Sequence, residues 1–209
     1  MCFHRQKTGP KVAVRALYVV GPSSTGKTTL CNAIVENLGI PKEAYITEVA
    51  RTVMRTTGFS REDVGKLEMQ SAILEAQLER EEEAREAARA APGSHTILSD
   101  RSAIDPIVYA ILTASNENEA NHRRRTLTEK DGFRRALPRY QHAEFILLEP
   151  VPEWLVDDGV RSLDNHVECS RVFKEVLEEL GIAYTVINAE TKDLAERVEV
   201  ALNLLTPHS

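Results

Sequence analysis

The chain has few cysteines, no long apolar run and no excess of positive charge. Its three cysteines, Cys2, Cys31 and Cys169, form no CxxC pair and no cluster with histidines. An odd number of scattered cysteines is typical of free thiols in a reducing compartment and gives no indication of a metal site. No stretch of about 18 apolar residues is present, so we expect no membrane span. The opening residues, MCFHRQKTGP, lack an apolar segment. We therefore expect no secretory signal and predict a cytoplasmic protein.

The charge balance disfavours another group of functions. The net charge of −6 is the opposite of what a general nucleic-acid or anionic-membrane binder needs, so we consider a nucleic-acid partner unlikely. The 42% hydrophobic and 28% charged residues are normal for a globular protein. A length of 209 residues is sufficient for one well-buried core. We expect a flexible leader over 1–11 and a single domain over 12–209.

Short β-rich runs alternate with helical patterns along the chain, which predicts an α/β fold with a parallel sheet. We expect strands at 12–20, 45–49, 96–99, 144–148 and 183–187. We expect helices at 27–38, 60–90, 103–115, 129–140, 167–180 and 192–205, with a surface loop at 116–128. The spacing of Ser60 and Asp63 resembles a capping box at the start of the long helix. Its second half, EEEAREAARA, is expected to face mostly solvent.

The most specific motif is GPSSTGKT at Gly21–Thr28, which satisfies G-x-x-x-x-G-K-S/T between a strand and a helix. Glycines let the backbone curl so that its N–H groups point at an anion, and the helix start adds a positive dipole end. Lys27 would reach the β- and γ-phosphates, and the Thr28 hydroxyl would take one Mg²⁺ position. The alternative is a plain Gly/Ser turn. The expected nucleotide-binding residues are Gly21, Ser23, Ser24, Thr25, Gly26, Lys27, Thr28 and Thr29.

A phosphate loop needs an acidic group near Mg²⁺, and Asp100 follows the strand 96–99 directly. Ligands of open parallel sheets collect at the carboxyl ends of strands, where Asp100 and the adjacent Arg101 would lie. We predict that Asp100 serves the metal and the reaction, and that Arg101 binds substrate. The alternative is that Asp100 or Ser102 caps the helix that follows.

Glu48 and Arg51 follow the second strand and would reach the same edge of the sheet. Glu48 could orient or deprotonate a substrate hydroxyl, and Arg51 could hold a phosphate or carboxylate. The alternative is a surface Glu–Arg pair at a helix start, worth a few tenths of a kcal/mol.

The segment D-D-G-V-R at residues 157–161 follows the fourth strand. Arg161 is a candidate lid arginine that would neutralise charge in the transition state, with a lid near 150–166. The alternative is a loop arginine paired with Asp157 or Asp158. Asn188 lies after the fifth strand, where a loop contacting adenine would fall.

A basic segment over 122–139 has seven basic and two acidic side chains, a local charge of +5 in an acidic protein. It could contact a phosphorylated substrate, a lipid headgroup or RNA, or it could be a solvated face. Its basic residues are Arg123, Arg124, Arg125, Lys130, Arg134, Arg135 and Arg139.

The four strand-end motifs, G-x-x-x-x-G-K-T, E-V-A-R, D-R-S and D-D-G-V-R, together resemble one group of P-loop proteins. It is the AAA-type ATPase/kinase family that includes the bacterial ribosylnicotinamide kinase domain, and more widely the nucleoside and nucleotide kinases. The resemblance implies a three-layer fold with a five-stranded parallel sheet in the order 2-3-1-4-5 and a mobile lid. It also implies that Asp100 serves Mg²⁺ or the acceptor hydroxyl and that Arg161 serves the lid.

Two functions follow as hypotheses. The first is a kinase that uses ATP (or GTP) and Mg²⁺ to phosphorylate a small, nucleoside-like molecule, with Lys27, Glu48, Asp100 and Arg161 as its catalytic residues. The second is a regulatory ATP- or GTP-binding NTPase that signals to a protein or a lipid. The absence of an N-K-x-D motif disfavours a GTPase.

Overall fold

The computed structural model describes residues 13–91, 95–154 and 163–206. Within these residues the strands form one parallel five-stranded sheet in the order β2-β3-β1-β4-β5, which confirms the expected fold class and strand order. The strands are β1 (Arg15–Val20), β2 (Tyr45–Ile46), β3 (Thr96–Asp100), β4 (Glu144–Leu148) and β5 (Thr185–Ile187).

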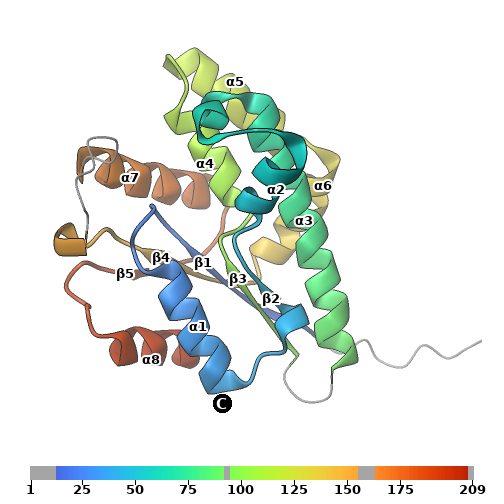
Figure 1. Cartoon of the computed structure of the whole chain (residues 1–209), viewed down its shortest axis with the longest axis vertical. Coiled ribbons are helices and arrows are strands. Elements are labelled where there is room, and N and C mark those ends of the chain that lie inside the picture. Colours follow the sequence, from blue (N-terminus) through green and yellow to red (C-terminus); the bar gives the residue numbers. More distant parts are fainter. Residues whose placement is uncertain (1–12, 92–94, 155–162, 207–209) are drawn as a thin grey trace, which may run out of the picture.

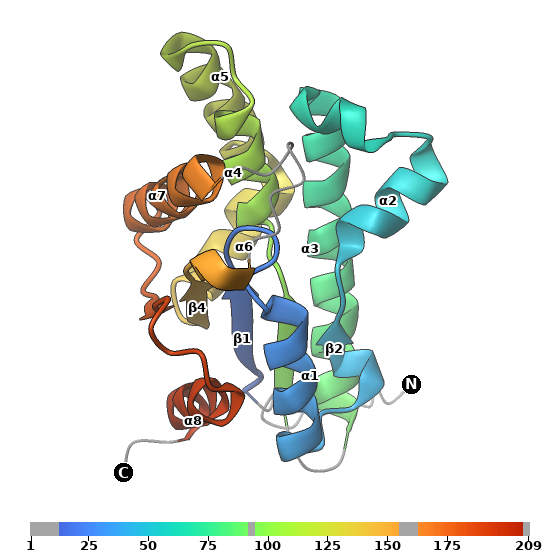
Figure 2. The same ribbon diagram turned by 60° about the vertical axis from the view of Figure 1, so that its left-hand side comes forward.

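Helices cover both faces of the sheet, so the domain has three layers (Figure 1). The helices are α1 (Lys27–Leu38), α2 (Val49–Thr57), α3 (Leu67–Ala90), α4 (Ile104–Leu112), α5 (Glu117–Thr128), α6 (Asp131–Tyr140), α7 (Leu163–Glu179) and α8 (Leu194–Leu205). Short 3₁₀ helices are η1 (Lys42–Ala44), η2 (Arg61–Gly65) and η3 (Pro152–Trp154). Helices α1 and α8 lie on one face, while α3, α4, α6 and α7 lie on the other (Figure 2).

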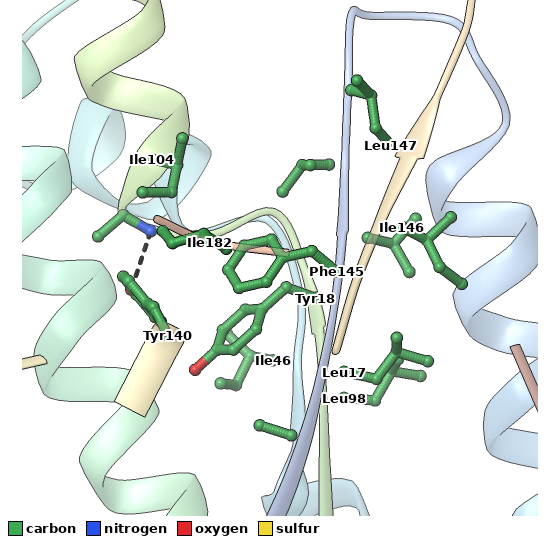
Figure 3. Packing of buried hydrophobic residues seen from close by; sticks show 14 of the residues in the cluster. Leu17, Tyr18, Ile46, Leu98, Ile104, Tyr140, Phe145, Ile146, Leu147 and Ile182 are labelled. Carbon is green, nitrogen blue, oxygen red and sulfur yellow. Dashed lines mark hydrogen bonds between the residues drawn. The ribbon is translucent and has the colours of Figure 1, made fainter. Parts of the chain in front are cut away.

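The sheet is buried on both faces, as its β-rich runs of apolar residues predict. Successive side chains of a strand point to opposite sides. Leu17 and Leu98 therefore pack toward α1, while Tyr18 and Phe145 pack toward α3 and α6 (Figure 3). All four are at most 1% exposed. The Tyr18 and Phe145 rings stack at 4.7 Å between centroids, and Tyr140 of α6 meets both rings edge-on.

The pairing of β1 with β3 brings two motifs to one edge of the sheet. Val19 lies opposite Asp100, and the Arg101 backbone N–H donates to the Val19 carbonyl at 3.0 Å. Gly21 begins the loop that follows β1. Because parallel strands end at the same edge, the phosphate loop and the D-R-S motif become neighbours there.

Three parts of the chain differ from the sequence prediction in their secondary structure. The expected strand at 45–49 ends at Ile46, and Val49 begins helix α2, which was not predicted and which is held by packing of Val53 against Met69 and Ile73 of α3. The expected loop at 116–128 is instead helix α5, because Asn116 caps it by accepting from the Glu119 N–H at 3.0 Å and Leu127 is buried beneath it. The expected helix at 60–90 is interrupted at Lys66. The Ser60–Asp63 capping box is present, but it begins η2, and α3 starts only at Leu67.

The second half of α3 is less solvent-facing than its charged sequence suggested. Glu81, Ala84, Arg85 and Ala88 are all at most 5% exposed. These residues recur every three or four positions, so they form one face of the helix, and that face packs against the sheet. The prediction failed because buried tyrosine hydroxyls on the sheet and on α6 provide polar partners for Glu81 and Arg85.

Some predictions concern residues outside the described part of the chain. These are the leader over 1–11, the central part of the lid near 150–166 (residues 155–162), and Arg161 with the D-D-G-V-R motif. Among the helices that are described, none is long and apolar enough to cross a lipid bilayer.

Candidate functional site

The loop from Gly21 to Gly26 has a backbone that only certain residues tolerate. Gly21 has φ +135°, and a Cβ placed on it would lie 2.5 Å from the Leu148 carbonyl oxygen of β4. Gly26 has φ +87° and precedes the first residue of α1, while Ser24 has φ +61°. Positive φ is costly for residues other than glycine and concentrates at binding sites. The two glycines of the motif are thus required by the geometry of the loop.

Lys27 is folded onto this loop. Its ammonium donates to the Pro22 carbonyl oxygen and to Thr25 Oγ1, the latter at 3.4 Å, and the residue is 5% exposed. Burial lowers the pKa of Lys27 to about 7, helped by the positive charge of Arg101 and opposed by Asp105 and Asp100. An anion beside Lys27 would raise this pKa again.

Thr28 and Asp100 meet directly, since Thr28 Oγ1 donates to Asp100 Oδ2 at 2.5 Å. Asp100 is 3% exposed at the end of β3. A hydroxyl and a carboxylate are the oxygen ligands that Mg²⁺ prefers, with water and phosphate oxygens as the remaining ligands. This pair therefore fits the predicted metal position.

Arg101 is held in an unfavourable backbone conformation, with φ +86°. Its guanidinium contacts Asp105 Oδ1 at 2.9 Å and Glu48 Oε1 at 3.4 Å. Burial by itself would lower the pKa of Arg101, but Asp105, Tyr109 and Glu48 more than offset it and the pKa is raised. A strained residue fixed by two carboxylates is typical of a functional site.

The two residues predicted beyond β2, Glu48 and Arg51, differ in exposure. Glu48 lies at the N-terminus of α2 and bridges Arg101 and Arg51. The side chain of Arg51 is 76% exposed and pairs with Glu48 at 2.8 Å, which matches the alternative of a surface ion pair. The side chain of Glu48 is only 27% exposed, and both residues line the same cavity.

These residues surround one cavity of about 740 Å³. One end is formed by the phosphate loop and the start of α1, and the other by α2, α3 and α4. Apolar side chains of α2 and α3 line the far end: Val49, Ala50, Met54, Met69 and Ile73. Polar groups line the rest: Glu48, Gln70, Gln77, Asp100, Arg101, Asp105 and Tyr109.

The sequence reasoning missed several of these polar residues. Asp105 accepts from the Ser102 backbone N–H at 2.9 Å and from Arg101, and burial raises the pKa of its carboxyl. Its place four residues after Arg101, in the first turn of a helix, could have been noticed. Gln70 and Gln77 lie two turns apart among apolar residues of α3, a polar stripe on a buried face.

Arg197 of α8 was also missed, and it supports the phosphate loop from behind. It is 2% exposed, donates to the Thr25 carbonyl at 3.0 Å and to the Thr191 carbonyl at 2.6 Å, and lies 4.5 Å from the centre of the Trp154 ring. Asn188 stabilises the turn before α8 by accepting from the Glu190 and Thr191 N–H groups. Its contact with adenine stays a prediction.

Four of the seven basic side chains in the segment over 122–139 pair with carboxylates. Arg123 pairs with Glu119, Arg124 with Glu179, Lys130 with Glu75, and Arg139 with Glu82. The whole segment is described, and none of its residues lines the cavity. The structure thus favours a solvated face over a second binding site.

Residues 16–197 match the model of a protein family described as an AAA domain. The chain belongs to this family. No curated protein sequence matches this AAA domain.

Solved structures share its P-loop, nucleoside-kinase-like fold. NadR protein in complex with NAD and AMP-PNP superposes with a TM-score of 0.66 at 18% identity, over 92% of this chain and 48% of that one. NadR protein in complex with NR superposes with a TM-score of 0.61 at 20% identity, over 92% of this chain and 50% of that one. The AAA domain spans about half the length of these NadR chains. Deoxyadenosine kinase from M. mycoides with products dCMP and a flexible dCDP bound superposes with a TM-score of 0.61 at 14% identity, over 91% of this chain and 98% of that one.

Proposed function

We propose that this AAA domain is a kinase that transfers the γ-phosphoryl group of a nucleoside triphosphate to a hydroxyl of a small, nucleoside-like molecule. One observation carries the proposal. The cavity is continuous from the phosphate loop to an apolar compartment under α2 and α3, with Glu48, Asp100 and Arg101 along it. A nucleotide-binding module that only hydrolyses its ligand has no need of a second compartment.

The nucleotide would occupy the end formed by Gly21–Thr29, with ATP or GTP as the donor. Backbone N–H groups of the loop and the Lys27 ammonium would hold the phosphates. Thr28 and Asp100 would hold Mg²⁺, which when bound neutralises charge on the phosphates.

The acceptor would occupy the apolar end, with its hydroxyl beside Glu48. In the reaction, the hydroxyl oxygen forms a bond to the γ-phosphorus while the bond from that phosphorus to the bridging oxygen breaks. The nucleoside diphosphate leaves with the bridging oxygen, and the proton of the hydroxyl goes to Glu48 as general base. Arg101 neutralises the charge on the transferred group. Arg51 at the rim and Arg161 in the expected lid would add positive charge on closure.

Two structural relatives support a nucleoside-like acceptor. NadR has been solved with NR, and the deoxyadenosine kinase with its products dCMP and dCDP. Met54, Met69 and Ile73 line the cavity here and offer apolar contacts to a flat ring.

The test is phosphoryl transfer measured as acceptor-dependent release of ADP, with nicotinamide riboside, ribonucleosides, deoxyribonucleosides and sugars as acceptors. We expect at least one nucleoside to stimulate turnover. Glu48→Gln should reduce kcat about 10²- to 10⁴-fold with little change in the KM for ATP. The matched control is Glu36→Gln, on the exposed side of α1. Hydrolysis that no acceptor stimulates would instead support a regulatory NTPase.

A further inference from the structure

Behind the α3 wall of the cavity lies a buried hydrogen-bonded cluster that the proposed reaction does not use. It joins Tyr18 of β1, Glu81 and Arg85 of α3, and Tyr140 of α6. All four residues are at most 5% exposed. The cluster reaches the cavity through Gln77, one turn before Glu81 on α3.

The direction of each hydrogen bond in the cluster is fixed by groups that can only donate. Arg85 Nη2 donates to the Tyr18 hydroxyl at 3.2 Å, so the Tyr18 proton is directed to Glu81 Oε2 at 3.0 Å. The backbone N–H of Ala103 donates to the Tyr140 hydroxyl at 3.2 Å (Figure 3). Tyr140 in turn donates to Glu81 at 2.8 Å. Glu81 is therefore an acceptor from both tyrosines.

This arrangement sets the orientation of the Gln77 amide. Its Nε2 lies 3.0 Å from Glu81 Oε1 and 3.1 Å from Ser99 Oγ. Burial raises the pKa of Glu81, while the hydrogen bonds from Gln77, Tyr140 and Tyr18 and the charge of Arg85 oppose this and favour the carboxylate. Against a carboxylate, the reversed orientation would place the amide oxygen opposite an oxygen with no proton to donate. The Gln77 NH₂ group thus faces the cluster. Its Oε1 has no hydrogen-bond partner among the described residues, and Gln77 lines the cavity.

Gln70 is oriented in the same sense by a different partner. It lies seven residues before Gln77, on the same face of α3. Its Nε2 donates to the Val64 carbonyl at 2.7 Å, and a carbonyl oxygen can only accept. Gln70 and Gln77 are both 2% exposed, and both line the cavity. The two amides leave their oxygens as the atoms available to a ligand.

We propose that Glu81 is a positioning residue that fixes Gln77 with its carbonyl oxygen toward the acceptor, so that Gln77 and Gln70 select an acceptor whose ring carries exocyclic N–H donors. This rests on the proposed kinase function and adds the chemical class of the acceptor. An exocyclic amine or a carboxamide would donate to the Gln77 oxygen, and a second donor elsewhere on the acceptor would reach the Gln70 oxygen, because the two residues lie two helical turns apart. A ring carbonyl or carboxylate at the same place would leave the Gln77 oxygen unpaired in a site shielded from water.

The test compares acceptors that differ only at this edge: adenosine with inosine, cytidine with uridine, and nicotinamide riboside with nicotinic acid riboside. In each phosphorylated pair we expect the amino or carboxamide member to have a kcat/KM about 10-fold higher or more. Gln77→Met should bring the ratio close to one while the thermal shift caused by ATP-Mg²⁺ stays as in the wild type. Gln141→Met, an exposed glutamine that donates to the Leu180 carbonyl, is the matched control.

A second variant tests the positioning role itself. Glu81→Gln would let Gln77 rotate, because the new amide can donate to it, so the ratio should fall mainly through KM. If that variant does not fold, the wild-type ratio and Gln77→Met still decide the selection.

A wild-type ratio near one or below one, with a compound phosphorylated, would overturn the inference and leave the kinase function intact. A ratio that Glu81→Gln leaves unchanged would overturn the role of Glu81. ATP binding with no compound phosphorylated would overturn the kinase proposal and this inference with it.

Discussion

The two ends of the cavity are constructed in different ways. The end where we propose that the nucleotide binds, called the nucleotide end, is built from eight consecutive residues, Gly21–Thr28, and its shape depends on backbone conformation. The end proposed for the acceptor, called the acceptor end, combines side chains from α2, α3, β3 and α4 that are far apart in the sequence. A local backbone structure leaves a motif in the sequence, whereas an assembled wall leaves only scattered polar residues on buried faces.

The two ends also differ in how they are anchored. The phosphate loop is attached to the main core through β1 and α1. By contrast, α2 packs in a separate small cluster with Val53, Met69 and Ile73. Elements with few buried apolar contacts open at lower free energy than the core. We therefore expect α2 to respond to the acceptor and the phosphate loop to remain fixed.

The largest expected effect is at the nucleotide end. Lys27→Ala should abolish the increase in melting temperature that saturating ATP-Mg²⁺ causes, and should lower turnover about 10³-fold. At 100 times Kd the wild type should gain about 2.7 kcal/mol, or roughly 5–10 °C. Differential scanning fluorimetry measures both proteins, with Lys42→Ala, an exposed lysine, as control. A melting shift that survives in Lys27→Ala would show that the loop does not hold the phosphates.

The shape of the loop provides the second test. Gly21→Ala should destabilise the fold by about 3 kcal/mol, because its Cβ would overlap the Leu148 carbonyl oxygen and φ is +135°. Gly39→Ala, with φ +59° and no atom within 4 Å of the added Cβ, should cost only about 1 kcal/mol. Urea denaturation gives both values. Equal losses in the two variants would mean that β4 does not press on the loop.

Asp100→Asn tests the junction of the two ends. The amide would remain a hydrogen-bond acceptor for Thr28 but would lose the charge that Mg²⁺ needs. We expect about a 10²-fold loss of turnover, partly recovered at higher Mg²⁺ concentration. Titration of activity against Mg²⁺ measures this, with Asp131→Asn on the exposed start of α6 as control. An unchanged Mg²⁺ requirement would remove Asp100 from the metal position.

The smallest effect is a linkage between nucleotide binding and pH. Burial lowers the pKa of Lys27 to about 7 from a usual 10.5, so between these values the unfolded chain holds a proton that the folded protein lacks. The free energy of unfolding should therefore gain a contribution that rises with pH in this window.

Binding of a polyphosphate should restore the proton. We expect an uptake of about one half proton at pH 7, approaching one at pH 9, and an affinity that falls at most about tenfold per pH unit. Calorimetry in buffers of different ionisation enthalpy measures the uptake. Lys27→Arg should show none, since arginine keeps its proton throughout. Wild-type binding without uptake at pH 9 would contradict the buried neutral lysine.

The sequence was sufficient for the sheet and the phosphate loop because both depend on local patterns. The apolar runs of the strands, the two glycines and the amphipathic α1 lie within short windows, and α1 was predicted with its observed bounds, Lys27–Leu38. The strand order came from the family resemblance rather than from any residue pattern. Asp100 and Glu48 could be placed at strand ends, but their contacts with Thr28 and Arg101 could not.

The failures involve tertiary contacts that override local preference. The polar sequence of α5 suggested a loop, but the Asn116 cap and the burial of Leu127 make it a helix. Glu81 and Arg85 suggested a solvated face because their partners, Tyr18 and Tyr140, come from other elements. The orientation of the Gln77 amide can be inferred only once Glu81 is known to be buried beside it.

The hydrogen bond from Arg197 to the Thr25 carbonyl connects α8, the last helix described, to the phosphate loop, which follows the first strand. During synthesis, residues 21–28 leave the ribosome long before α8 does. A nascent chain would therefore carry the complete motif while lacking its rear support. We expect tight nucleotide binding only after Arg197 has left the ribosome. ATP should then stabilise chains that include α8, whereas chains without α8 would remain susceptible to proteolysis.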